Sequence, residues 1–139
     1  MTAPPNTAPS PASFQSLMAF DFGLRRVGVA KGLRQLGHGM PLPTIKAEGK
    51  AVFEPIAVLI KAWEPQALVV GVPRHPDGAE HDMTRRARKF AAQLRGRFYL
   101  PVFEVDERYT SACAQDEGAQ DLDAAAAVLI LEQFLRESS

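Results

Sequence analysis

Five short apolar runs along the chain predict five β-strands. Each is bounded by Gly, Pro or charged residues, as is typical of strands in a buried sheet. A turn through residues 23–26 joins the first two runs and predicts a hairpin, while Pro41 and Pro43 indicate that the third strand is an edge or irregular strand. The predicted strands cover residues 17–20, 27–30, 40–45, 67–72 and 101–105.

Apolar positions at helical spacing predict helices over residues 51–63, 82–97 and 122–136, and a short helix is expected from Thr110. In the second of these helices the apolar stripe consists of Met83, Ala87, Phe90 and Leu94. The order of elements is therefore βββαβαβα. It predicts an α/β fold in which a mixed sheet carries helices on both faces.

Residues 1–16 contain four of the 11 prolines among small and polar residues, so we expect a disordered tail. The remaining residues, 17–139, form one domain of ordinary size. Hydrophobic residues make up 46% of the chain and charged residues 23%, which excludes a disordered or fibrous protein. A lone cysteine, Cys113, excludes an intramolecular disulfide and fits the reducing cytoplasm. No apolar run is long enough to span a membrane, so we expect no membrane association.

The net charge is zero, but the charges are unevenly distributed. Residues 85–97 hold six of the 16 basic residues and no acidic one, whereas residues 104–139 hold nine acidic residues against two arginines. A basic block followed by an acidic block suits a metal-dependent enzyme that acts on a polyanion. The same pattern also arises by chance or from solubility, so it decides little alone.

Carboxylates follow two of the predicted strands. Asp21 comes directly after the first strand, where ligands gather in open α/β sheets, although it could equally form an Asx turn into Gly23. Asp106 and Glu107 follow the last strand. Neighbouring residues of a strand point to opposite faces, so only one of this pair could join Asp21 if the strands are neighbours. The alternative is that Asp106 and Glu107 are solvated charges in a loop without a role in a site.

Asp123 lies on the inward face of the last predicted helix, because it shares that face with Ala127, Ile130 and Phe134. An N-cap is the alternative role, and Asp121 could take it instead. Three acidic positions far apart in the chain could thus converge on one sheet edge. Phosphodiester hydrolysis by two metal ions needs such a cluster.

At these residues the sequence resembles the YqgF family, RuvC-like members of the ribonuclease H-like superfamily. The opening D-x-G-x-x-x-x-G-V-A pattern, the V-V-G-V-P run, the D-E-R motif and the final L-D-A-A-A-A helix occur in the family's order. Together these segments span nearly all of residues 17–135. They lie at residues 21–30, 69–73, 106–108 and 122–127.

The resemblance implies a ribonuclease H-like fold and a nuclease that depends on Mg²⁺ or Mn²⁺. It implies a substrate of structured RNA, pre-16S ribosomal RNA matured at its 5′ end, or, by analogy, branched DNA at Holliday junctions. Asp21, Glu107 and Asp123 match the family's catalytic carboxylates, and Asp106 stays open as a metal ligand in place of Glu107. The chain departs from the family at residues 109–121, which are shorter than usual and lack Lys and Arg.

Basic residues are the candidates for nucleic-acid contacts. Arg85, Arg88 and Lys89 lie away from the apolar stripe of their helix, where they could contact phosphates or form only a solvated face. Arg25 and Arg108 are further candidates. A non-catalytic RNA-binding module is a rival to the nuclease, whereas an actin-like ATPase would need a second domain. We expect a cytoplasmic monomer or weak homodimer.

Overall fold

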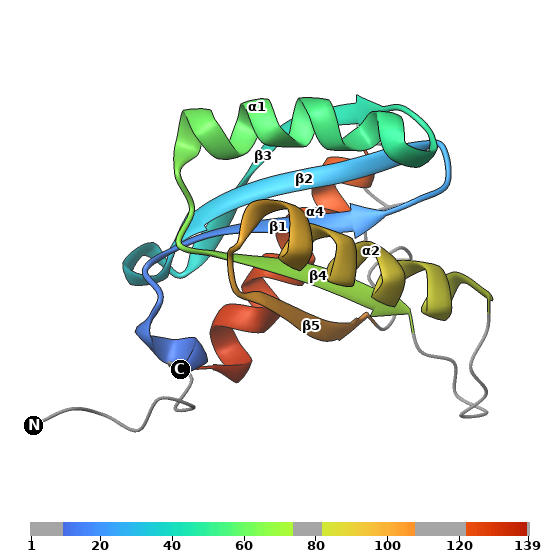
Figure 1. The fold of residues 1–139 in the computed structure, drawn as a ribbon. Coiled ribbons are helices and arrows are strands. Elements are labelled where there is room, and N and C mark those ends of the chain that lie inside the picture. Colours follow the sequence, from blue (N-terminus) through green and yellow to red (C-terminus); the bar gives the residue numbers. More distant parts are fainter. Residues whose placement is uncertain (1–9, 74–81, 108–121, 139) are drawn as a thin grey trace, which may run out of the picture.

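A five-stranded sheet forms the centre of the computed structural model, which describes residues 10–73, 82–107 and 122–138 (Figure 1). The strand order is β3-β2-β1-β4-β5. The strands are β1 (Ser16–Phe22), β2 (Arg26–Leu33), β3 (His38–Lys46), β4 (Ala67–Pro73) and β5 (Val102–Glu107). The helices are α1 (Phe53–Trp63), α2 (Asp82–Phe98) and α4 (Leu122–Glu137), with short 3₁₀ helices η1 (Pro11–Ser13), η2 (Arg34–Leu36) and η3 (Gly49–Val52).

The pairing of the strands brings three strand ends to one edge of the molecule. β2 pairs antiparallel with β1 and with β3, whereas β4 pairs parallel with both β1 and β5. β1, β4 and β5 therefore run in the same direction, and their arrowheads point to the same side in Figure 1. Their carboxyl ends form the sheet edge at which ligands bind in open α/β folds.

Helices cover both faces of the sheet. Met18 and Phe20 of β1 pack in a core with residues of α1 and α2, including Ile56 and Phe90. Leu17 and Ala19, which point the other way, pack against α4. The alternation along β1 thus separates two buried cores (Figure 1), and the predicted α/β architecture with its βββαβαβα order is confirmed.

The five predicted strands and three longer helices are all present, with ends that differ by a few residues. β3 is an edge strand, as its prolines indicated. The start of the first helix was predicted too early, because residues 49–52 form the separate 3₁₀ helix η3. The short helix expected from Thr110 lies outside the described residues.

The folded part begins before Leu17. Residues 11–13 form η1, Phe14 packs against Phe103 with ring centroids 5.7 Å apart, and Arg34 Nε donates a hydrogen bond of 2.8 Å to the Phe14 carbonyl. The sequence assigned these residues to the tail because their composition is polar and Pro-rich. The ring of Phe14 and the hydrogen bonds from Arg34 to the carbonyls of Phe14 and Pro11 hold these residues in place. Residues 1–9 lie outside the described residues.

The helices in the described ranges include none that is long and apolar enough to cross a membrane.

Candidate active site

Strand register places Asp21 and Glu107 at the same edge and on the same face of the sheet. Phe20 pairs with Val70 of β4, so Asp21 lies level with Gly71, and Glu107 is the last residue of β5. Because Ala19 packs on the α4 side, Asp21 also points there. Val105 packs on the α4 side as well, which sends Glu107 to that side and Asp106 to the other. The structure thus selects Glu107 over Asp106 as the neighbour of Asp21.

Gly71 makes this approach possible. β1 and β5 are not direct neighbours, because β4 lies between them. A Cβ atom on Gly71 would stand 3.3 Å from Oε2 of Glu107 and would overlap the side chain of Ile130. Since Gly71 has no side chain, the carboxylate of Glu107 extends over β4 toward Asp21.

Asp123 reaches the same place from the start of α4. Gly28 of β2 pairs with Asp21, and a Cβ there would overlap the backbone carbonyl of Asp123. The first turn of α4 therefore rests directly on the strand that flanks Asp21. Asp123 is the second residue of the helix, so it is not the N-cap. The expected inward face is confirmed: Ala127, Ile130 and Phe134 are buried.

The carboxyl groups of Glu107 and Asp123 both act on the ionisation of Asp21. Burial of Asp21 raises the pKa of its carboxyl from 3.8 to about 8, and the charges of Glu107 and Asp123 and a hydrogen bond with Glu107 add to the increase. Arg26 offsets part of this negative charge, because its Nε lies 3.5 Å from Oδ2 of Asp123. The Asp123 side chain is 33% exposed, so solvent weakens that ion pair.

The chemistry of these side chains fits a hard divalent cation. Mg²⁺ and Mn²⁺ prefer carboxylate oxygens and water. A cation would oppose both the burial and the carboxylate repulsion that raise the pKa of Asp21. Within the described residues, no three His, Cys, Asp or Glu side chains stand close enough together to hold a metal ion. A cation would therefore have to draw Asp21, Glu107 and Asp123 closer to one another.

The predicted basic residues occupy different surroundings. Arg25 is exposed in the turn between β1 and β2, and Lys89 is exposed on α2. Two others on α2 are ion-paired: Arg88 Nε lies 3.4 Å from Glu104, and Arg85 lies 3.5 Å from Asp82. Arg108 lies outside the described residues.

Sequence reasoning missed two further cations near this edge. Arg86 pairs with Asp82 at 2.6 Å. Lys50 of η3 and Lys89 of α2 line one groove, which lies between these two helices and the β1–β2 turn. Arg86 belongs to the basic run that the sequence showed. Lys50 carried no signal, because only the folding of the chain brings η3 beside α2.

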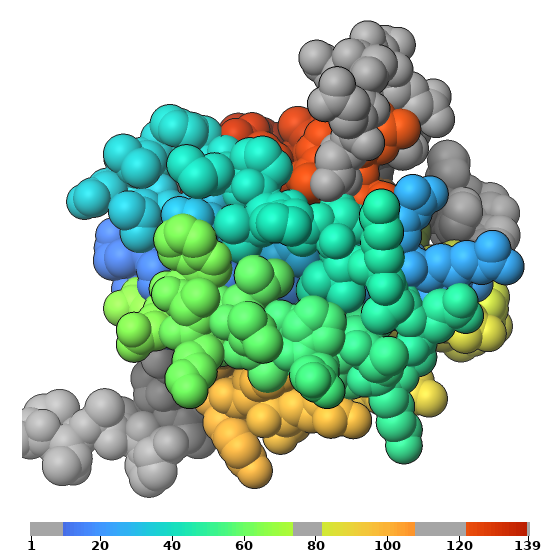
Figure 2. All heavy atoms as spheres, turned by 90° about the horizontal axis from the view of Figure 1, so that it is seen from above, coloured from blue at the N-terminus to red at the C-terminus, as the bar shows by residue number. Residues whose placement is uncertain are grey.

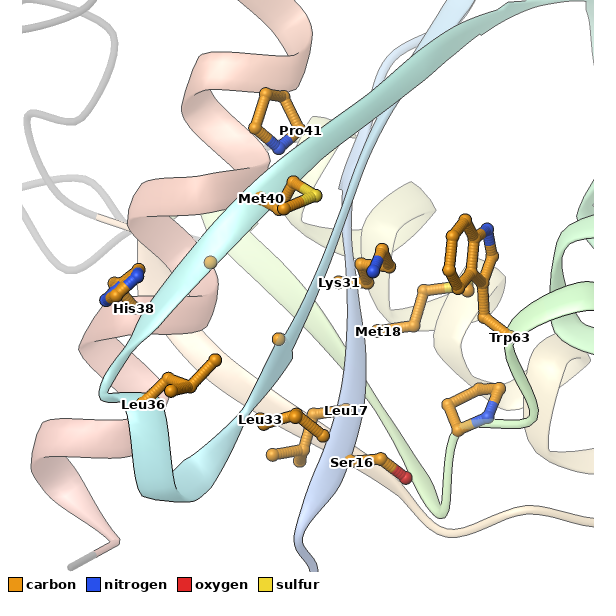
Figure 3. A pocket seen from close by; sticks show the side chains of 13 residues that line it. Ser16, Leu17, Met18, Lys31, Leu33, Leu36, His38, Met40, Pro41 and Trp63 are labelled. Atoms are coloured by element: carbon orange, nitrogen blue, oxygen red, sulfur yellow. The ribbon is translucent and has the colours of Figure 1, made fainter.

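A separate cavity of about 400 Å³ opens at the opposite end of the sheet (Figure 3). Figure 3 shows Lys31 and Met18 beside the ring of Trp63, and Lys31 Nζ lies 3.8 Å from the ring centroid. The described residues that line the cavity include no carboxylate. The cavity therefore lacks the carboxylate oxygens that Mg²⁺ and Mn²⁺ prefer, which the edge with Asp21 provides.

A family match and two similar proteins point to the same family of nucleases. Residues 15–137 match the family described as "RuvX: Holliday junction resolvase". The chain is 61% identical over 125 residues to a protein of Albidiferax ferrireducens named "Putative pre-16S rRNA nuclease", covering 90% of this chain and 80% of that one. It is 56% identical over 125 residues to a Polaromonas protein of the same name, covering 90% and 91%.

Among solved structures, the fold is similar to RuvC of Thermus thermophilus in complex with a Holliday junction substrate. The TM-score is 0.56 at 13% identity, over 88% of this chain and 95% of RuvC. At that identity the likeness concerns the fold alone.

Proposed function

Because this chain belongs to the RuvX family, we propose that it is a nuclease that hydrolyses phosphodiester bonds in pre-16S ribosomal RNA. The observation that carries the proposal is the meeting of Asp21, Glu107 and Asp123 at the carboxyl ends of β1 and β5 and the start of α4. The family match and the names of the relatives support the reaction and the substrate. A ribosomal RNA substrate would place the protein in the cytoplasm.

Asp21, Glu107 and Asp123 would hold Mg²⁺ or Mn²⁺. Such an ion, when bound, supplies positive charge for the attacking and leaving oxygens of the phosphodiester. Asp21 must be ionised to act as a ligand, and its raised pKa means that much of it carries a proton at pH 7 in the absence of a cation. Arg26 orients Asp123 through their ion pair. Gly28 and Gly71 let the two other carboxylates approach Asp21.

RNA is favoured over branched DNA as the substrate. Two relatives named for pre-16S rRNA are 61% and 56% identical to this chain, whereas RuvC is 13% identical. A DNA resolvase remains the second candidate, because the family description names Holliday junctions.

Cleavage assays test the proposal. Purified protein is incubated with a pre-16S RNA fragment or with a four-way DNA junction, each with Mg²⁺ or Mn²⁺. We expect metal-dependent cleavage of the RNA, and a loss of two or more orders of magnitude in rate for Asp21→Asn, Glu107→Gln and Asp123→Asn. Asp106→Asn is the matched control, since it removes a neighbouring carboxylate on the opposite face of the sheet, and it should retain the rate.

Each other result has a distinct meaning. Cleavage of the junction alone would transfer the assignment to DNA resolution. RNA binding without cleavage would indicate a non-catalytic module. An Asp21→Asn protein that cleaves at the wild-type rate would remove this sheet edge from the chemistry.

A further inference from the structure

We propose that a groove near the carboxylates binds a second phosphate of the substrate backbone. The groove lies at the same end of the sheet as the carboxylates but on the opposite face. The groove lies between the turn that joins β1 to β2, the helix η3 and the first half of α2. Its cationic residues are Lys50, Arg86 and Lys89. The inference rests on the proposed nuclease function and adds to it a path for the nucleic-acid strand.

The shape of the groove suits a phosphate group. Its volume is about 250 Å³, below the ~300–1,000 Å³ typical of sites for whole small molecules. Phe53 and Phe90 form an apolar wall, with ring centroids 6.0 Å apart. Among the described residues that line the groove, none is acidic. An anion that enters it would meet three cations there.

The described residues neutralise the charge of the groove only in part. Arg86 pairs with Asp82, which lies outside the groove lining, at 2.6 Å. Lys50 and Lys89 form no ion pair with the carboxylates of residues 10–73, 82–107 and 122–138. Two lysines that line one groove repel each other, and a bound phosphate would convert that repulsion into attraction.

The position of the groove connects it to the proposed active site. Phe22 lines the groove and packs on Phe90, with ring centroids 4.9 Å apart. The residue before it, Asp21, points to the opposite face. The groove and the carboxylates thus lie back to back across the end of β1. A strand that crosses this edge can present one phosphate to the carboxylates and another to the lysines.

The figures show that the elements bordering the groove lie at one end of the sheet. In Figure 1 the β1–β2 turn and the starts of α1 and α2 all lie on the side to which β1 and β4 point. In Figure 2, which looks down on α1, the blue atoms of that turn and the yellow atoms of α2 lie together on this side. α4 covers the other face of the sheet.

The salt dependence of RNA binding tests the inference. Binding of a fluorescently labelled pre-16S RNA fragment is measured without divalent cation at several salt concentrations. For Lys50→Ala/Lys89→Ala we expect a log–log slope that is shallower by about one unit, because the groove holds one phosphate and the variant loses that contact. The matched control is Lys31→Ala/Lys61→Ala, which removes the same charge at the far end of the sheet and should keep the wild-type slope. A groove variant with the wild-type slope would overturn the inference.

A second arm separates a nucleic-acid backbone from a free nucleotide. Inorganic phosphate and adenosine monophosphate are titrated in a thermal melt of wild type and the groove variant. The nucleotide could stabilise only the wild type while the salt dependence of RNA binding is the same in both proteins. That result would assign the groove to a mononucleotide and overturn the proposal that it binds the RNA backbone. Lys50 and Lys89 are exposed, so the groove variant should melt close to the wild type.

Failure of the inference and failure of the proposed function give different results. If the groove variant keeps the wild-type slope while Asp21→Asn abolishes cleavage, the groove assignment fails and the nuclease stands. If wild type cleaves neither substrate but the groove variant has the shallower slope, the nuclease assignment fails and the groove stands.

Discussion

The proposed active site depends on two positions that carry no side chain. Gly28 allows the first turn of α4 to touch β2, and Gly71 allows Glu107 to reach across β4. Neither glycine has a positive φ, so steric room rather than backbone freedom requires them. These two residues position carboxylates that come from three separate elements.

Replacing Gly28 with alanine should therefore destabilise the protein. The new Cβ would overlap the backbone of Asp123, which moves only if α4 shifts, and overpacking of this kind costs about 1–3 kcal/mol or more. Gly96→Ala is the control: it lies in α2 with open space around it and should stabilise by about 0.5–1 kcal/mol. Urea unfolding of the two variants measures both effects. Equal stabilities would contradict the close contact at Gly28.

Asp21 should make the metal-free protein less stable as the pH rises. The folded state keeps its proton up to about pH 8, whereas an unfolded aspartate releases it near 3.8. Between these values the folded state binds more protons, so the free energy of unfolding falls by up to about 1.4 kcal/mol per pH unit. Asp21→Asn removes this contribution. Melting in the presence of a chelator from pH 5 to pH 8 should show a smaller decline for the variant, and parallel profiles would disprove the shift.

At the scale of elements, α2 combines two surfaces. Its buried stripe, which includes Ala87, Phe90 and Leu94, packs on the sheet, while its arginines and Lys89 face solvent. Arg88 and Glu104 link the helix to β5 through an exposed pair. Exposed pairs contribute only about 0–1 kcal/mol, so a phosphate can displace such a carboxylate.

Removing the exposed cations of α2 should weaken RNA binding in a salt-dependent manner. For Arg85→Ala/Arg88→Ala/Lys89→Ala we expect a log–log slope shallower by about three units, because each cation gives up one phosphate contact. Anisotropy titrations at several salt concentrations provide the slope. If it stays at the wild-type value, α2 does not contact the backbone.

For the whole molecule, cation binding should stabilise the folded state. The three carboxylates are brought together only by folding, so Mg²⁺ or Mn²⁺ binds the native protein alone and raises its melting temperature. At about 100 times Kd the stabilisation is about 2.7 kcal/mol, equivalent to several degrees for a domain of this size.

Substitutions of Asp21 and Asp106 test where the cation binds. Asp21→Asn should abolish most of the increase in Tm, and Asp106→Asn should retain it, because Asp106 points to the other face of the sheet. A thermal melt with and without cation measures the difference. An Asp21→Asn protein with the full increase would place the cation elsewhere.

The sequence by itself determined the elements, their order and the face on which Asp123 lies. These properties follow from local periodicity: apolar runs in strands and the i, i+4, i+7 spacing that puts Asp123 in line with Ala127 and Ile130. The family motifs identified the candidate carboxylates. Local pattern failed where a few contacts override composition, as at Phe14, which packs on Phe103 and accepts a hydrogen bond from Arg34.

Only the tertiary structure decided how the carboxylates meet. The position of β4 between β1 and β5 depends on pairing between distant segments, which no local pattern encodes. That pairing explains why Glu107 rather than Asp106 approaches Asp21, and why Gly71 must lie between them. It also brings Lys50 beside Lys89, two residues 39 positions apart in the sequence, because η3 and α2 meet at the end of β1.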